Sequence, residues 1–479
     1  MGEAAPGGIE ANPSTLTANR SFIKQRKGFI SPTSSFVDFG TLENEYYTEE
    51  GRETADFYNP HQNRELKRPT TDFEAATHLL KGSVGAGLLA MPKAFSHVGV
   101  VFGFIITVII TFLCVYAMDV LLSMQYIQCQ RLRTPFIPLP ASMRIGFKNG
   151  PRRLRCFASI APLLVDIFLI SCQLGFCTAY IIFIASSIKQ VVEPRFVEDL
   201  NLKLYILMIF IPVCLTNYIR DLKKLMPLSL LANILILFSL GCCLYYIFCV
   251  GRWNTDTVKM VVPVQTWPLF VGTVLFALEA VGVIIALEHN MKNPEHFLGC
   301  RGIFPWCMLV VSFLYVFIGL IGYLKYGEDV KETIFASLPK DDWLALTVYA
   351  IYGFCIFLTY PLQCFVSLEI LWGNYIRHVV DDPLKEFIVE YILRTVTVLI
   401  TFIAALTIPQ IDIVISLIGA LCISCLGMIF PFTLELVTRY PNDFGRWNWI
   451  LIKDIILILL GFGILVIGTY TSLYTFLFS

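Results

Sequence analysis

The sequence predicts an all-α polytopic membrane protein, and three features of the chain support this class. Of its 479 residues 56% are hydrophobic, only 15% are charged, and the mean hydropathy is +0.69. Soluble proteins carry about a quarter charged residues. Apolar runs of about 20 residues, enough for a helix to cross a bilayer, recur along the chain. The 36 basic residues balance 36 acidic ones, which argues against a nucleic-acid partner because phosphate binding needs a basic excess.

The first 71 residues differ in composition from the rest. They hold 18 charged residues, whereas the other 408 residues hold 54. They are also rich in Gly, Pro, Ser and Glu, a composition typical of disordered segments. We therefore expect a disordered cytosolic tail at 1–71 and a transmembrane domain at 72–479.

Eleven apolar segments are long enough to span the membrane. The predicted spans are 72–97, 99–124, 158–186, 203–219, 226–250, 266–290, 304–325, 343–371, 389–408, 411–438 and 450–477. With the N-terminus in the cytosol, the inside loops hold 16 Lys and Arg residues, and the outside loops hold seven when Lys203 at the start of the fourth span is included. This positive-inside bias predicts a cytosolic N-terminus and a C-terminus outside the cell or in a lumen. The basic loop 125–156 is part of that signal, and contact with anionic lipid is the alternative reading.

Glycines interrupt the first predicted span. The patch consists of Gly82, Ser83, Val84, Gly85, Ala86 and Gly87. A glycine weakens a helix by about 1 kcal/mol relative to alanine, so helical structure is weakest here. The patch begins after a helix rise of about 15 Å, which places it near the bilayer midplane.

The sixth span carries Phe276 and Glu279 at a similar depth. Two interrupted helices, the first and the sixth, predict a five-plus-five inverted repeat followed by one more helix. Irregular backbone survives at this depth only where it is buried in protein or lines a cavity. The half-helix N-terminus in the first span suits a carboxylate, and unwound carbonyls in the sixth suit an ammonium group. We therefore expect a zwitterion site, with close helix packing as the alternative explanation of the glycines.

Five segments, in this order, resemble the proton-coupled amino acid transporters of the amino acid/auxin permease family. They are 78–92 (HLLKGSVGAGLLAMP), 166–177 (DIFLISCQLGFC), 219–233 (IRDLKKLMPLSLLAN), 322–327 (GYLKYG) and 408–419 (IPQIDIVISLIG). The resemblance covers residues 72–474. It implies an eleven-helix LeuT-like fold and symport of small neutral amino acids, of the glycine, alanine and proline type. It also implies co-transported protons and no cofactor.

The resemblance assigns proton coupling to the histidine before the glycine patch, which is His78, and substrate binding to the backbone of the patch. An imidazole titrates near physiological pH, as this role requires. The alternative is an interfacial histidine paired with Glu74, which lies four residues earlier on the same helix face. Glu279 is interpreted as a proton carrier, a polar wall of the site, or an acid that caps the broken helix.

Asp166 and Glu288 are expected in supporting roles. Asp166 is expected to pair with Lys81 or another cation. Glu288, at the cytosolic end of the sixth span, is expected to form a gate or loop contact. Arg394 follows Glu390 by four residues, so a local ion pair is predicted.

These features predict a secondary active transporter and not an enzyme, because no catalytic or metal-ligating constellation is legible. The expected partners are the amino acid substrate and the lipid bilayer. The alternative function is an amino acid sensor with little net flux, whose signalling partner binds the N-terminal tail. The expected location is the lysosomal or late endosomal membrane or the plasma membrane.

Overall fold

Apolar helices account for most of the structure, a computed structural model. It describes residues 58–64, 69–83, 85–193, 200–219, 222–251, 253–278, 281–299, 301–339, 342–377, 383–441 and 443–478. Over these residues there is no β-strand, and one isolated parallel bridge joins Thr70 to Met291. The predicted all-α class is therefore confirmed.

The helices follow the predicted spans closely. They are α3 (Asp72–Ser83), α4 (Ala86–Val98), α5 (Val100–Leu132), α6 (Leu139–Asn149), α7 (Ala161–Val192), α8 (Leu202–Met208), α9 (Phe210–Asn217), α10 (Leu222–Cys249), α11 (Trp267–Ala277), α12 (Val281–Asn290), α13 (Ile303–Tyr326), α14 (Trp343–Leu371), α15 (Pro383–Thr407), α16 (Ile411–Ile418), α17 (Phe430–Arg439) and α18 (Trp449–Phe478). Two π-helical turns connect α16 to α17. Each predicted span coincides with one helix or with consecutive helical segments.

Seven helical stretches of the described chain are long and apolar enough to cross a membrane. They are Val100–Leu132, Ala161–Val192, Ile303–Asp329, Trp343–Ile376, Lys385–Thr407, Ile411–Arg439 and Arg446–Phe478. The other predicted spans are built from α3 with α4, α8 with α9, α10, and α11 with α12. The protein is thus a multi-pass membrane protein, and the number of eleven spans stays a prediction.

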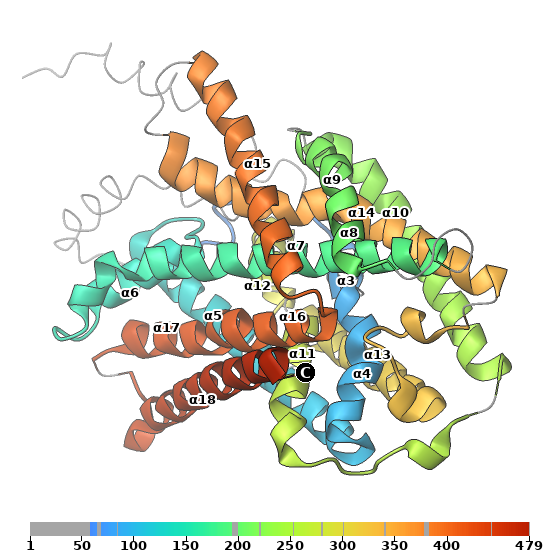
Figure 1. Cartoon of the computed structure of the whole chain (residues 1–479). Helices are drawn as coiled ribbons and strands as arrows, with labels where there is room; N and C mark the ends of the chain where they lie inside the picture. The colour runs from blue at the N-terminus through green and yellow to red at the C-terminus, as the bar shows by residue number, and fades with distance from the viewer. Residues whose placement is uncertain are drawn as a thin grey trace, which may run out of the picture.

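The helices divide into central and peripheral ones. The α16 residue Ile415 is fully buried, whereas Leu459 and Val466 of α18 are 63% and 64% exposed. Figure 1 shows α17 and α18 side by side, and above them α7 runs along α14. Large apolar side chains that are exposed on a peripheral helix indicate a surface that contacts lipid.

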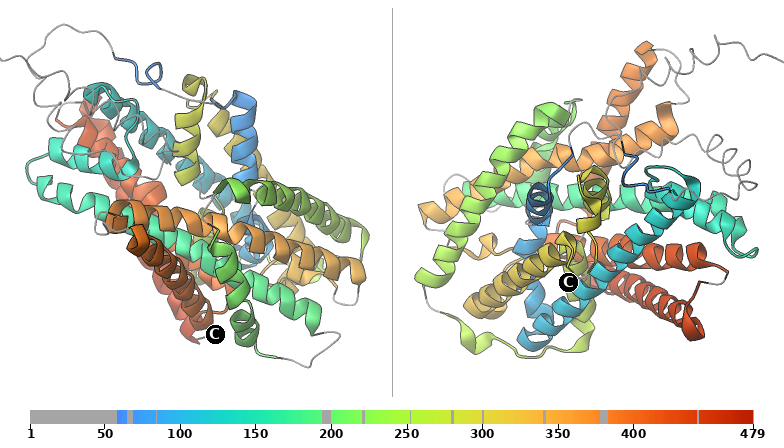
Figure 2. Two further views of the ribbon diagram at one scale, coloured as in Figure 1. Left: turned by 90° about the horizontal axis from the view of Figure 1, so that it is seen from above. Right: turned by 180° about the vertical axis from the view of Figure 1, so that it is seen from behind.

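The two interrupted helices lie against each other. α4 packs on α11, and α3 packs on α12. Both panels of Figure 2 show α3 (blue) beside α12 (yellow). A Cβ added at Gly87 would lie 2.6 Å from the Ala277 Cα, so glycine is required for this approach of α4 to α11. The breaks predicted in the first and sixth spans are therefore neighbours in space.

The 125–156 region contains more helix than the loop we expected. α5 continues to Leu132, and α6 follows it. Leu139, Met143 and Gly146 of α6 are buried where the helix packs on α7 and α17. The abundance of Arg and Lys in this region conceals an apolar helix face, because an amphipathic helix carries both.

The 322–327 segment joins α13 to the end of α10. The Lys325 ammonium donates to the carbonyl oxygens of Val250 at 2.6 Å and Gly251 at 3.0 Å. These carbonyls follow the last turn of α10, where a cation is favourable. Gly327 adopts a φ of +59°, a conformation that disfavours other residues. The lysine and the final glycine of this motif thus have structural roles.

A buried ion network fixes α18 to α17 and α5. The Lys453 ammonium donates to the Tyr116 hydroxyl at 2.6 Å and to Glu435 Oε2 at 2.7 Å, and it lies 3.0 Å from Asp454 Oδ1. Arg439 pairs with the other Glu435 oxygen at 2.9 Å. One buried carboxylate is therefore shared by two cations.

Candidate functional site

Among the described residues, none fills the space beside the N-terminus of α4. Its N-cap residue, Gly85, has an extended backbone with φ −132° and ψ −155° and supplies no side-chain cap. A Cβ added at Gly85 would meet no atom of the described residues within 4 Å, in contrast to Gly87 on the Ala277 side. The first backbone N–H groups of a helix lack intrahelical partners and carry its positive dipole end. This end of α4 is thus suited to an anionic group.

The end of α11 is only partly available to a ligand. The carbonyl of Ala277, the last residue of α11, accepts a hydrogen bond from the Tyr315 hydroxyl at 2.6 Å. Phe276 is 3% exposed and contacts Phe176, with ring centroids 4.4 Å apart. Phe276 therefore helps to close the break against α7.

Several predicted site residues lie outside the described part of the chain. Val84 and Glu279 are among them, and for Gly82, Ser83 and Ala86 the structure gives the helical backbone only. Residues 1–57 and 65–68 of the expected tail also lie outside it.

His78 lies on an exposed face of α3, five residues before the helix ends. That separation is about 7.5 Å of helix rise. The neighbouring Glu74 carboxylate accepts a hydrogen bond from the Thr71 N–H at 2.9 Å, so it caps α3. Glu74 also interacts electrostatically with His78. The structure thus keeps both interpretations of His78 open.

Asp166 is 4% exposed and is held by neutral donors. Its Oδ2 accepts from Asn374 Nδ2 at 3.1 Å and from the Tyr375 hydroxyl at 2.9 Å. We expected Lys81 here as the cation, but its side chain is not among those that the structure describes. Asp166 therefore joins α7 to the π-helical turn that follows α14.

Glu288 is contacted by a segment that we assigned to the tail. Arg64 Nη2 lies 2.8 Å from Glu288 Oε1, and Arg64 Nη1 donates to the Glu288 carbonyl at 2.9 Å. His61 Nε2 lies 3.4 Å from the same carboxylate, and its ring centroid is 4.5 Å from that of Tyr126. We call residues 58–64 the N-terminal strap. It joins α5 to the last turn of α12, where the Arg64 cation also satisfies terminal carbonyls.

The predicted ion pair on α15 is confirmed. Arg394 Nη2 lies 3.0 Å from Glu390 Oε1, and Arg394 Nη1 donates to the Asn217 carbonyl at 2.8 Å. Arg394 thus also links α15 to α9.

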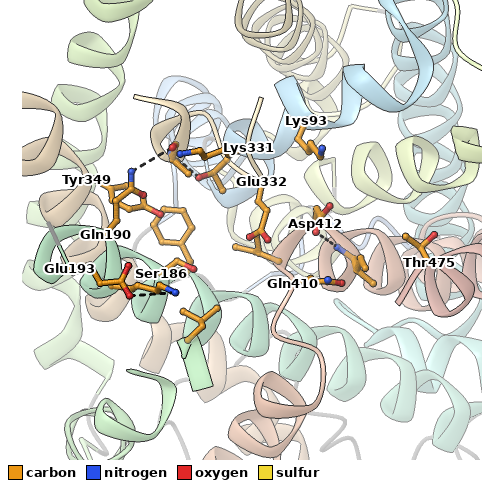
Figure 3. Close-up of a pocket in the computed structure, with 17 residues that line it drawn as sticks. Lys93, Ser186, Gln190, Glu193, Lys331, Glu332, Tyr349, Gln410, Asp412 and Thr475 are labelled. Atoms are coloured by element: carbon orange, nitrogen blue, oxygen red, sulfur yellow. Dashed lines mark hydrogen bonds and ion pairs between the residues drawn. The ribbon is translucent and has the colours of Figure 1, made fainter. Parts of the chain in front are cut away.

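A cavity of about 590 Å³ lies beyond the far end of α4 from the break. Its walls come from α4, α7, α14, α16 and the loop after α13 (Figure 3). Its charged lining residues are Lys93, Lys189, Glu193, Lys331, Glu332 and Asp412. α3 leads from the N-terminal strap to the break, and α4 leads from the break to this cavity. The cavity and the strap therefore lie on opposite sides of the break.

Glu332, in the loop that borders this cavity, has a raised pKa. Burial and the adjacent Asp412 carboxylate raise the pKa of Glu332 to about 7, while Lys93 and the Ile411 backbone act in the opposite direction. We did not single out these residues from the sequence, because they are far apart along the chain and no motif joins them.

Comparison with known proteins gives consistent matches. The family model described as transmembrane amino acid transporter protein matches residues 68–474. The proton-coupled amino acid transporter-like protein pathetic of Drosophila melanogaster is 35% identical over 416 residues, which are 87% of this chain and 87% of that protein. Vacuolar amino acid transporter 3 of Saccharomyces cerevisiae is 28% identical over 438 residues, which cover 87% of this chain and 57% of that protein.

Among solved structures, a substrate-bound, outward-open Na⁺-coupled sialic acid symporter aligns with a TM-score of 0.45 and 13% identity, over 93% of this chain and 97% of that one. The family match covers most of the chain and coincides with its multi-pass helical domain. The chain therefore belongs to the transmembrane amino acid transporter family, whose members are carriers and not enzymes.

Proposed function

We propose that the protein is a proton-coupled symporter of small neutral amino acids, of the glycine, alanine and proline type. The observation that supports this most is the uncapped N-terminus of α4 at Gly85, where a Cβ would contact no part of the chain that the structure describes. Backbone N–H groups at such an end bind carboxylates without a cationic side chain. A site of this kind accepts the carboxylate that all amino acids share.

The break in the sixth span supplies the other side of the proposed site. Remaining carbonyls between α11 and α12, together with Glu279, bind the substrate ammonium. Contact between Gly87 and Ala277 closes one side of the break, so the substrate occupies the Gly85 side. The printed name of the fly relative supports proton coupling, and His78 and Glu279 are the proposed carriers.

Alternating access moves the two interrupted helices around this site. The N-terminal strap ties α12 to α5 on one side, and the 590 Å³ cavity opens on the other. Glu288 and Arg64 therefore form a gate on the strap side, which the charge bias places in the cytosol. The compartment is the lysosomal or late endosomal membrane or the plasma membrane, and the vacuolar relative favours the first.

A sensor is the second candidate, favoured by the strap itself. A partner that binds the preceding tail residues would act on the Arg64–Glu288 contact directly, so site occupancy and tail binding would be coupled. A sensor of this kind binds amino acids with little net flux.

Gly85→Leu tests the proposed site. The added side chain fills open space, so we expect the protein to fold and insert while uptake and exchange of labelled alanine are lost. The matched control is Gly241→Leu on α10, where an added Cβ also meets no described atom within 4 Å. It should transport normally. Normal alanine exchange in the Gly85→Leu variant would move the site elsewhere.

A further inference from the structure

We propose that the 590 Å³ cavity, here called the outer vestibule, is a second binding site for zwitterionic amino acids on the path to the break. Lys93 binds the substrate carboxylate, and Glu332 with Asp412 binds the ammonium group. The inference rests on the proposed function, because the ligand class is taken from it.

The three residues come from different elements and converge on one part of the vestibule. Lys93 is on α4, Asp412 is in the first turn of α16, and Glu332 is in the loop after α13 (Figure 3). Lys93 attracts both carboxylates electrostatically. Among the described residues, however, none of the three forms an ion pair within 4.0 Å.

Two other charges in the same vestibule neutralise each other. Lys189 and Glu193 of α7 lie 3.4 Å apart as an i,i+4 pair. The charges of Lys93, Glu332 and Asp412 are half-buried without such a partner. Partly buried charges are unfavourable unless they are compensated, and a zwitterion compensates both signs at once.

The vestibule lies close enough to the break for a substrate to pass from one to the other. Lys93 follows Gly85 by eight residues on α4. This is about 12 Å of helix rise, or two turns. A substrate whose carboxylate leaves Lys93 therefore moves along one helix to reach the N–H groups at its start.

The site is expected to weaken in acid. With its pKa near 7, Glu332 gains a proton as the pH falls through neutrality, and a neutral carboxyl no longer attracts an ammonium group. The groups facing it are Asp412, Lys93, Lys331 of its own loop, Tyr349 of α14 and the Lys189–Glu193 pair. Protons and substrate thus compete for this carboxylate.

The test is exchange of labelled alanine in oriented proteoliposomes at equal pH on both sides, which removes the proton driving force. For Lys93→Gln, Glu332→Gln and Asp412→Asn we expect the KM from the vestibule side to rise about three- to tenfold, as for loss of one partly screened charge. The maximal rate and the KM from the other side should not change. Lys93→Arg and Glu332→Asp should restore the KM.

Two controls define the outcome. Lys189→Gln and Glu193→Gln alter charges in the same vestibule that pair with each other, and they should leave the KM unchanged. Lowering the pH on both sides from 8 to 6 should raise the wild-type KM from the vestibule side but not that of Glu332→Gln. An unchanged KM in all three neutral variants, or an equal rise from both sides, would overturn the vestibule site.

Failure of the proposed function gives a different result. If Gly85→Leu still exchanges alanine, the break is not the central site, whatever the vestibule variants do. If the wild type exchanges no amino acid, equilibrium binding of labelled alanine to the wild type and to the triple neutral variant decides the question. Equal binding would then exclude the vestibule site.

Discussion

His78 and Glu279 are the rival proton carriers of the proposed symport cycle. His78 lies on an exposed face of α3. Glu279 belongs to the sixth span, between the end of α11 and the start of α12. Both side chains are ionisable and belong to predicted membrane spans, so each is a candidate proton carrier.

We expect His78→Ala to lose acid-stimulated uptake while exchange without a pH gradient survives in part. The measurement is the substrate-driven proton current, compared with Glu279→Gln at equal surface expression. His296→Ala is the matched control, because this exposed histidine pairs with Asp72 at 2.8 Å and is not assigned to coupling. A normal proton current in His78→Ala with loss in Glu279→Gln would assign coupling to the sixth span.

At the residue scale, local signals could be predicted and distant ones could not. The glycine patch is contiguous, and the ion pair of Arg394 with Glu390 follows from helix spacing. Lys93, Glu332 and Asp412 line one cavity only because four helices and a loop pack around it. We expected Asp166 to pair with a cation, but the hydrogen-bond donors that the structure describes are the neutral side chains of Asn374 and Tyr375.

At the scale of elements, the contacts of the N-terminal strap predict how often the strap opens over the small cavity beneath it. Arg64 and His61 bridge α12 and α5 through Glu288 and Tyr126, and Cys129 lines the small cavity beneath the strap. Loss of a charge-assisted hydrogen bond, worth about 1.5 kcal/mol, should increase opening about tenfold.

We therefore expect Arg64→Ala to speed maleimide labelling of Cys129 about tenfold, in proportion to that opening. Labelling followed by mass spectrometry measures the rate at each cysteine. Cys114, which is also buried on α5 but does not line this cavity, is the internal control. Equal labelling of Cys129 in the wild type and in Arg64→Ala would show that the strap does not close this side.

The contact of α18 with α17 depends on Glu435, a residue that is only 2% exposed. Its carboxylate forms ion pairs with both Lys453 and Arg439. Removing one partner of a buried pair costs about 3–5 kcal/mol, because the remaining charge is left uncompensated. We expect Glu435→Gln to lower the melting temperature in detergent by several degrees. Glu328→Gln, which removes a half-exposed partner of Lys259, should change it little. Equal melting temperatures would mean that α18 is held by apolar packing alone.

The membrane-spanning helices could be predicted from the length of the apolar segments. The two breaks could be predicted from the glycine patch in the first span and from Glu279 in the sixth. The helix α6 could not, because its basic residues masked the buried positions Leu139 and Met143. The contact of the strap with Glu288 depends on tertiary packing over 224 residues of sequence separation, for which no local pattern exists.

For the whole molecule, the charge bias of the loops predicts the orientation. A tag before Met1 should be protected in the cytosol, and a tag after Ser479 should be accessible from outside or from the lumen. Protease digestion of intact and permeabilised membranes measures this. Cleavage of both tags from the same side would contradict the odd number of spans.

Composition and hydropathy determine the membrane class of the whole molecule, since a chain with 15% charged residues cannot cover its apolar helices in water. The packing of α3 with α12 and of α4 with α11 brings the two breaks together, and we propose that they form one site. Which amino acids enter this site depends on the space at Gly85, which composition does not reveal.

Proton-coupled amino acid transport is tested most directly by uptake into proteoliposomes that contain the full chain and a pH-sensitive dye. Labelled glycine, alanine and proline are supplied outside at pH 5.5 or 7.5, with the interior at pH 7.5. We predict faster uptake at the acidic outer pH, accumulation above equilibrium, and substrate-dependent acidification of the interior that a protonophore abolishes. Binding of the amino acids without uptake, or uptake that ignores the proton gradient, would contradict the account.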